Sequence, residues 1–221
     1  MLEQISNRYK GSCMMVMQRE GESVTFLGSS FLVHEGGYLL TTSRVAIENA
    51  ELLVVPPDTT NEYAYLTRDE VNPVPVEIVA RDHEHDVALL KMTPDLDIQM
   101  PSNVIGDPEN LVRGAHLFSL GVPFGYYRIH GVMEVQSILS EKMRTRNGTR
   151  CLIFDRGVHF GDSGGPLISA SGGQIVGIVG GVLDPVAFGG VQSETVVHPN
   201  LSYAISMEYG ANLLREEGVT G

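Results

Sequence analysis

The sequence of 221 residues contains no tryptophan and only two cysteines, Cys13 and Cys151. Each cysteine stands in an apolar, strand-like run, Cys13 before Met-Met-Val and Cys151 before Leu-Ile-Phe. Thiols in such runs are typically buried and act as small hydrophobic groups, so we expect no disulfide. A sparse and unpaired cysteine content favours a reducing compartment, which predicts a cytoplasmic location.

Basic residues are also few, and long hydrophobic runs are absent. Fifteen Lys and Arg stand against 27 Asp and Glu, which gives a net charge of −12. This balance argues against binding to nucleic acid or to an anionic membrane surface. No apolar run has the length of a membrane span. The first eight residues, 1–8, lack the apolar core of a signal peptide, although a chain whose leader had been removed would look the same.

Glycine, by contrast, is plentiful at 25 residues, and it separates short runs rich in Val, Ile and Leu. This texture predicts an all-β protein. A segment rich in Pro, Asp and Asn, 93–109, divides the chain into an N-terminal half, 1–100, and a C-terminal half, 101–221. Helix formers follow over Met207–Glu217. Six strands are expected in each half: Ser12–Gln18, Ser23–His34, Tyr38–Thr42, Glu51–Pro56, Val76–Asp82 and Val87–Met92, then Ala115–Val122, Gly131–Lys142, Arg150–Asp155, Gly165–Ala170, Gln174–Val182 and Leu201–Ser206. We therefore predict two packed six-stranded antiparallel β-barrels with a short C-terminal helix.

The motif with the most chemical content is Gly161-Asp162-Ser163-Gly164-Gly165-Pro166. A nucleophilic serine needs exposure on a tight turn, backbone N–H groups directed at a developing oxyanion, and a base. The glycines supply the turn, and the N–H groups of Gly161 and Ser163 would form the oxyanion hole. A glycine-rich hairpin without catalytic meaning would explain a single Gly-x-Ser, but not six matching residues placed before a strand.

Nearly the whole chain resembles the trypsin-like serine peptidases, and among them the HtrA-type proteases. Besides the serine loop, the resemblance rests on five runs in that family's order: Gly28–Val33, Gly37–Thr42, Asp86–Lys91, Gly121–Gly125 and Tyr203–Ile205. It implies the double β-barrel already predicted, with an active site in the cleft between the barrels. It also implies a peptide or protein ligand, no cofactor or metal, and the option of a homo-oligomer.

The resemblance assigns the other two positions of a catalytic triad. Asp86, in His-Asp-Val-Ala-Leu-Leu, matches the aspartate that orients the base. The histidine position, after Leu40-Thr41-Thr42-Ser43, holds Arg44. Arginine stays protonated and offers no acceptor lone pair, so it cannot act as the base. It could pair with Asp86 and leave Ser163 unactivated.

Other histidines could in principle replace the base. His83 and His85 flank Asp86, but neighbouring residues of an extended segment point to opposite sides. His159 lies four residues before Ser163 and is the least implausible substitute. His34 lies before the hairpin turn, and His116, His130 and His198 have no motif context. For Asp162, Arg150 and Arg156 are alternative partners.

The resemblance also places a substrate pocket. Gly157 would lie at its base with Val158 and His159 beside it, and Ile178-Val179-Gly180-Gly181 would pair with a bound peptide backbone. No acid stands at the base, which predicts a neutral, apolar side chain in the pocket. Three functions remain open: a protease fold that has lost its base and binds peptides, an active endopeptidase with an unorthodox or assembly-supplied base, and an active enzyme in which Arg44 is an introduced change.

Overall fold

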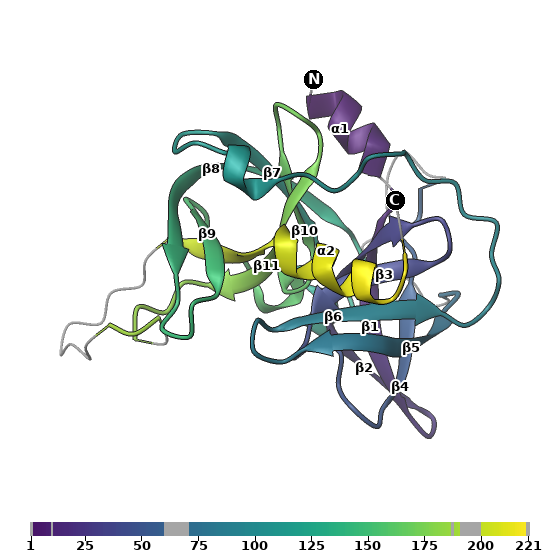
Figure 1. Cartoon of the computed structure of the whole chain (residues 1–221). Coiled ribbons are helices and arrows are strands. Elements are labelled where there is room, and N and C mark those ends of the chain that lie inside the picture. The colour runs from purple at the N-terminus through teal and green to yellow at the C-terminus, as the bar shows by residue number, and fades with distance from the viewer. Residues whose placement is uncertain (1, 10, 60–70, 187, 191–199, 220–221) are drawn as a thin grey trace.

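The computed structural model describes residues 2–9, 11–59, 71–186, 188–190 and 200–219. In this part of the chain, two closed antiparallel β-barrels stand side by side (Figure 1). The first barrel has the strand order β1-β2-β3-β6-β5-β4 and the second β10-β11-β12-β9-β8-β7. The strands are β1 Cys13–Glu20, β2 Ser23–His34, β3 Tyr38–Thr42, β4 Glu51–Val55, β5 Val74–Asp82, β6 Val87–Met92, β7 His116–Gly121, β8 Met133–Arg144, β9 Arg150–Phe154, β10 Pro166–Ser169, β11 Ile175–Val182 and β12 Ser202–Ser206. The predicted fold class is confirmed.

The strand bounds follow from the local sequence. The β2–β3 hairpin has the predicted bounds, and its turn uses Gly37 at a φ of +78°, a left-handed conformation that glycine adopts without strain. Strand β6, Val87–Met92, also has the predicted bounds, and the remaining strands differ from the prediction by one or two residues at one or both ends. The boundary between the halves, 1–100 and 101–221, stays a prediction, and the barrels themselves extend over 13–92 and 116–206.

Each end of the chain forms a helix that packs on the barrel from the opposite half. The C-terminal helix α2, Met207–Glu216, follows β12 directly and packs against β5 and β6 of the first barrel (Figure 1). The sequence analysis did not anticipate α1, Leu2–Tyr9. Its Tyr9 is buried and donates a hydrogen bond from its hydroxyl to the Gly173 carbonyl of the second barrel, 2.8 Å away.

The interior of each barrel is filled by alternate strand residues, and a further apolar cluster joins the barrels. That cluster contains Phe31 and Leu89 from the first barrel together with Ile168 and Ile178 from the second. Both cysteines are free and buried. Burial raises the pKa of the Cys13 thiol far above its usual range and that of Cys151 to about 12.

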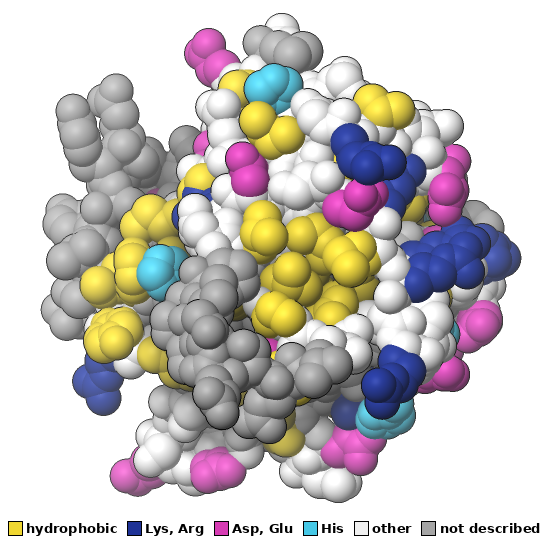
Figure 2. Space-filling model, turned by 90° about the vertical axis from the view of Figure 1, so that its left-hand side faces the viewer, with side chains coloured by type: hydrophobic (Ala, Val, Ile, Leu, Met, Phe, Trp, Pro, Cys, Tyr) yellow, Lys and Arg dark blue, Asp and Glu magenta, His cyan; other side chains and the backbone are white. Residues whose placement is uncertain are grey.

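The surface mixes charges of both signs. On the face shown in Figure 2, a group of hydrophobic side chains is exposed near the middle, and Lys, Arg, Asp and Glu side chains are interspersed around it. Among the described residues, no helix has both the length and the apolar character needed to cross a bilayer. The same residues hold no group of three or more His, Cys, Asp or Glu side chains arranged for a metal ion.

Candidate active site

The serine loop is held in a single short turn by glycines that no larger residue can replace without collision. Residues Phe160–Asp162 form a 3-10 helix, and Ser163 follows as its C-cap. Gly164 has a φ of +89°, and a Cβ there would collide with the Ser29 carbonyl and the Thr41 hydroxyl. The first barrel therefore presses directly against the loop that the second barrel presents, which places Ser163 at the junction.

Ser29 of β2 connects the first barrel to the serine loop through hydrogen bonds. Its buried hydroxyl donates to the Gly161 carbonyl at 2.7 Å and accepts from the Val122 backbone N–H at 3.0 Å. The Ser29 backbone N–H also donates to the Ser163 carbonyl at 2.8 Å. One small polar residue thus satisfies three backbone groups that come from two different segments of the second half of the chain.

Asp162 uses local donors. Its carboxylate accepts the backbone N–H of His159 at 2.9 Å. Burial raises the pKa of Asp162, and this hydrogen bond and the nearby Arg156 oppose the rise. Of the two alternatives from the sequence, Arg156 is the one whose charge acts on Asp162, because Arg150 pairs with Glu109 and Glu208 at 2.7 and 3.0 Å.

Arg44 lies between the two predicted triad partners. It stands in the turn that follows β3, and Asp86 stands in the turn before β6 at a φ of +57°. The Arg44 Nη1 donates to Asp86 Oδ2 at 2.6 Å, and the Arg44 backbone N–H donates to Oδ1 at 3.1 Å. Burial raises the pKa of the Asp86 carboxyl, and the Arg44 charge counteracts that rise. The structure therefore brings Arg44, Asp86 and Ser163 together.

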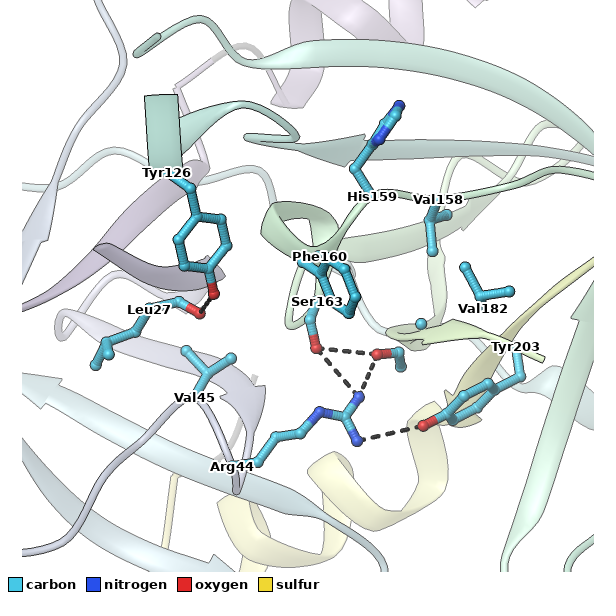
Figure 3. A pocket seen from close by; sticks show the side chains of 12 residues that line it. Leu27, Arg44, Val45, Tyr126, Val158, His159, Phe160, Ser163, Val182 and Tyr203 are labelled. Carbon is cyan, nitrogen blue, oxygen red and sulfur yellow. Dashed lines mark hydrogen bonds between the residues drawn. The ribbon is translucent and has the colours of Figure 1, made fainter. Parts of the chain in front are cut away.

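The other edge of the guanidinium faces Ser163 (Figure 3). Arg44 Nη2 donates to Ser163 Oγ at 3.1 Å and also to the Gly180 carbonyl. The Ser163 hydroxyl donates to that same carbonyl at 2.9 Å and lies 3.5 Å from the Thr42 hydroxyl. Among the described residues, these partners of Ser163 Oγ include no histidine and no carboxylate. The hydroxyl proton is directed at an amide carbonyl, which is far too weak a base to remove it.

One of the two predicted oxyanion-hole donors, the Ser163 N–H, is engaged internally. The backbone N–H of Ser163 donates to the Phe160 carbonyl at 3.3 Å, as the 3-10 turn requires. In this conformation the N–H bonds within its own loop instead of facing an approaching carbonyl oxygen. An oxyanion could use it only after the 160–163 turn opens.

The histidines have partners other than Ser163. His85 Nδ1 contacts Asp82 at 2.6 Å, and its ring stacks on Tyr209 of α2 with centroids 3.9 Å apart. His83 contacts Glu48 at 3.3 Å. His159 packs against Phe124, and Figure 3 shows its ring directed away from Ser163. His198 lies outside the described residues.

A cavity of about 480 Å³ opens beside Ser163. Four of the predicted pocket residues line it, namely Val158, His159, Gly180 and Gly181. The other three lie elsewhere. The Gly157 N–H donates to Asn200 Oδ1 at 2.7 Å, and Ile178 and Val179 are fully buried in the barrel core. The sequence analysis missed six further lining residues: Leu27, Val45, Tyr126, Phe160, Val182 and Tyr203. The walls are largely apolar, and the neutral, apolar side chain expected in the pocket stays a prediction.

Comparison with known proteins agrees with this architecture. Residues 28–178 match the trypsin-like peptidase domain family. The chain is 34% identical over 164 residues to a probable periplasmic serine endoprotease, DegP-like, of Pseudomonas putida (strain W619), covering 73% of this chain and 29% of that protein. It is 29% identical to the magnetosome formation protease MamE of Magnetospirillum gryphiswaldense (strain DSM 6361 / JCM 21280 / NBRC 15271 / MSR-1), covering 76% of this chain and 21% of that one.

Among solved structures, the HtrA-type protease AlgW with a decapeptide superposes with a TM-score of 0.73 at 20% identity, over 98% of this chain and 67% of that one. The chain belongs to the trypsin-like peptidase domain family, and its sequence relatives are HtrA/DegP-type proteases. It spans less than a third of the length of those curated relatives.

Proposed function

We propose that this chain is a protease-fold domain that binds peptides or segments of proteins but hydrolyses them not at all or only very slowly. The observation that carries the proposal is the position of Arg44, whose guanidinium contacts Asp86, Ser163 and the Gly180 carbonyl at once. The space that a catalytic base needs is thereby filled by a permanent cation.

The chemical consequence follows from proton transfer. Nucleophilic attack requires a group that accepts the Ser163 proton, and a guanidinium has no lone pair for it. Removing the base from a triad lowers turnover by about a million-fold, or ~8 kcal/mol of barrier. The hydrogen bond from the Ser163 N–H to the Phe160 carbonyl adds to this loss, because the oxyanion would also lack one donor.

The binding half of the proposal rests on the cavity. A largely apolar hollow of about 480 Å³ with a few convergent polar groups is typical of a ligand site. The HtrA-type protease AlgW has been solved with a decapeptide. In this chain, the segment Gly180–Val182 lines the cavity at the end of β11 and is the segment we propose for pairing with a peptide backbone. A cytoplasmic location and a homo-oligomeric state also stay predictions.

A fluorophosphonate probe, which labels only activated serines, tests the inactive half. We expect no labelling of the native chain and labelling of Arg44→His, in which a base is restored beside Asp86. Ser163→Ala in both backgrounds identifies the labelled residue. Labelling of the native chain that disappears in Ser163→Ala would contradict the proposal and favour an active endopeptidase with an unorthodox base.

A further inference from the structure

The cavity beside Ser163 carries a charge opposite to that of the chain. Arg44 is the one permanently charged residue among its described lining residues, and none of those residues is Asp or Glu. The chain as a whole has a net charge of −12. Arg44 is paired with Asp86 at one edge of its guanidinium, and the edge that borders the apolar hollow attracts an anionic group more strongly than a fully solvated guanidinium does.

The carboxylate that pairs with Arg44 does not enter this cavity. Asp86 contacts the Nη1 edge of the guanidinium and lines a separate surface hollow together with Ser43, Glu48 and His83. The Nη2 edge faces the cavity (Figure 3). Asp86 and the Tyr203 hydroxyl, 3.2 Å from Nη1, therefore orient the guanidinium, and Nη2 is left on the side of Ser163.

The Nη2 edge has only neutral oxygen partners in the described part of the chain, the Ser163 hydroxyl and the Gly180 carbonyl. A carboxylate makes shorter and stronger hydrogen bonds to a guanidinium than a neutral oxygen does. If a carboxylate takes the place of the Gly180 carbonyl on Nη2, the Ser163 hydroxyl can turn and donate to it as well. The site then offers two converging donors to one anionic group.

We propose that the cavity binds a carboxylate at Arg44 and Ser163, and that its source is the free C-terminus of a peptide. This inference rests on the proposed peptide-binding function. A peptide end fits because its last side chain would lie against Val158, Val182 and Tyr203, which line the cavity beside Ser163. An internal segment has an uncharged amide at that point and gains nothing from Arg44.

Fluorescence polarisation on the native chain tests the preference with three fluorescein-labelled octapeptides of one apolar sequence. The first ends in valine with a free carboxylate, the second is its C-terminal amide, and the third is an amide with a Glu side chain at the last position. We expect the free acid to bind at least about tenfold more tightly than either amide, a difference of about 1.4 kcal/mol. Measurement near 0.15 M salt limits the effect of the distant acidic residues, because charges are then screened within about 8 Å.

A matched pair of variants assigns the preference to Arg44. In Arg44→Gln, the dissociation constants of the free-acid peptide and its C-terminal amide should lie within about twofold of each other. Arg113→Gln removes the same charge from an exposed residue of the second half, whose guanidinium pairs with Glu141, and should leave the tenfold preference intact. Circular dichroism of both variants checks that they are folded.

Each outcome has a distinct meaning. Equal binding of acid and amide by the native chain overturns the carboxylate site and leaves peptide binding in place. Tight binding of the Glu-bearing amide, equal to that of the acid, overturns the chain end as the source. Binding of none of the peptides at about 1 mM contradicts the proposed function and this inference together.

Discussion

The ion pair between Arg44 and Asp86 gives the most direct test of how the altered site is held. Two hydrogen bonds connect the residues. The Arg44 Nη1 donates to the Asp86 carboxylate at 2.6 Å and the Arg44 backbone N–H donates to it at 3.1 Å, so only the first depends on the Arg44 side chain. The Asp86 side chain is 29% exposed and that of Arg44 is 47% exposed. Arg44→Met removes the cation and keeps much of the apolar stem, while Asp86→Asn removes the anion.

The magnitude lies between two limits. Breaking a fully buried pair by removing one partner costs about 3–5 kcal/mol, whereas an exposed pair contributes about 0–1 kcal/mol. Because the Arg44 side chain is 47% exposed, we expect Arg44→Met to lower the free energy of unfolding by about 1–2 kcal/mol at neutral pH. In the double variant, Asp86→Asn should cancel most of that loss.

The loss should depend on pH in a defined direction. Burial already raises the pKa of Asp86 above its unfolded value, and removal of Arg44 raises it further. A carboxyl with a raised pKa stabilises the fold at low pH, and that contribution disappears as the pH rises through the folded-state pKa. The cost of Arg44→Met is therefore full at neutral pH and shrinks as the pH falls and Asp86 becomes protonated.

Urea unfolding of the four proteins of this double-mutant cycle, from about pH 8 to about pH 4, measures both quantities. A coupling energy below about 0.3 kcal/mol at neutral pH would refute the reasoning, since distant and independent sites behave in that way. A cost of Arg44→Met that stays constant across this pH range would refute the assignment of the effect to the Asp86 charge.

Two further predictions concern the serine loop, both measured by thermal unfolding. Gly164→Ala should lower the free energy of unfolding by at least about 3 kcal/mol. The control Gly148→Ala should lower it by about 1 kcal/mol, because Gly148 has a nearly equal φ of +91° but open space around it. Equal losses for the two variants would mean that the positive φ alone, and not the collision of the new Cβ, sets the loss in free energy of unfolding. Ser29→Ala should lower the free energy of unfolding by about 2–3 kcal/mol, because it leaves a buried N–H and a buried carbonyl unpaired. The control Ser30→Ala removes an equally buried hydroxyl with a single 3.5 Å contact and should lower it by no more than about 1 kcal/mol.

The features that the sequence predicted are those fixed by local chemistry. The turn at Gly36-Gly37 and the alternation around it define the β2–β3 hairpin, and a run of six residues, Gly161–Pro166, defines the serine loop. The pairing of Arg44 with Asp86 was also anticipated, but from the resemblance to the trypsin-like peptidases, which assigned both positions, and not from local chemistry.

The features that the sequence could not show depend on where the backbone points. Nothing in the pair Gly180-Gly181 indicates that one carbonyl faces Ser163, and nothing in Phe160 indicates that its carbonyl accepts the Ser163 N–H. Ile178 and Val179 match the strand pattern equally well, yet their side chains fill the core while Val182, further along β11, reaches the cavity. Helix α1 was missed because its contacts are distant in sequence: Ile5 and Tyr9 are buried in the core, and the Tyr9 hydroxyl donates to the Gly173 carbonyl.

The crossed packing of the two terminal helices has a consequence for how the chain folds. Helix α1 is bound to the second barrel through Tyr9, and Gly210 of α2 packs against Leu40 of the first. The apolar face of α1 is buried only when the second barrel is present, and α2 packs on β5 and β6 of the first barrel as well as on β11 and β12 of the second. We therefore expect the two barrels to unfold in one cooperative transition, which calorimetry would show as a single thermal peak.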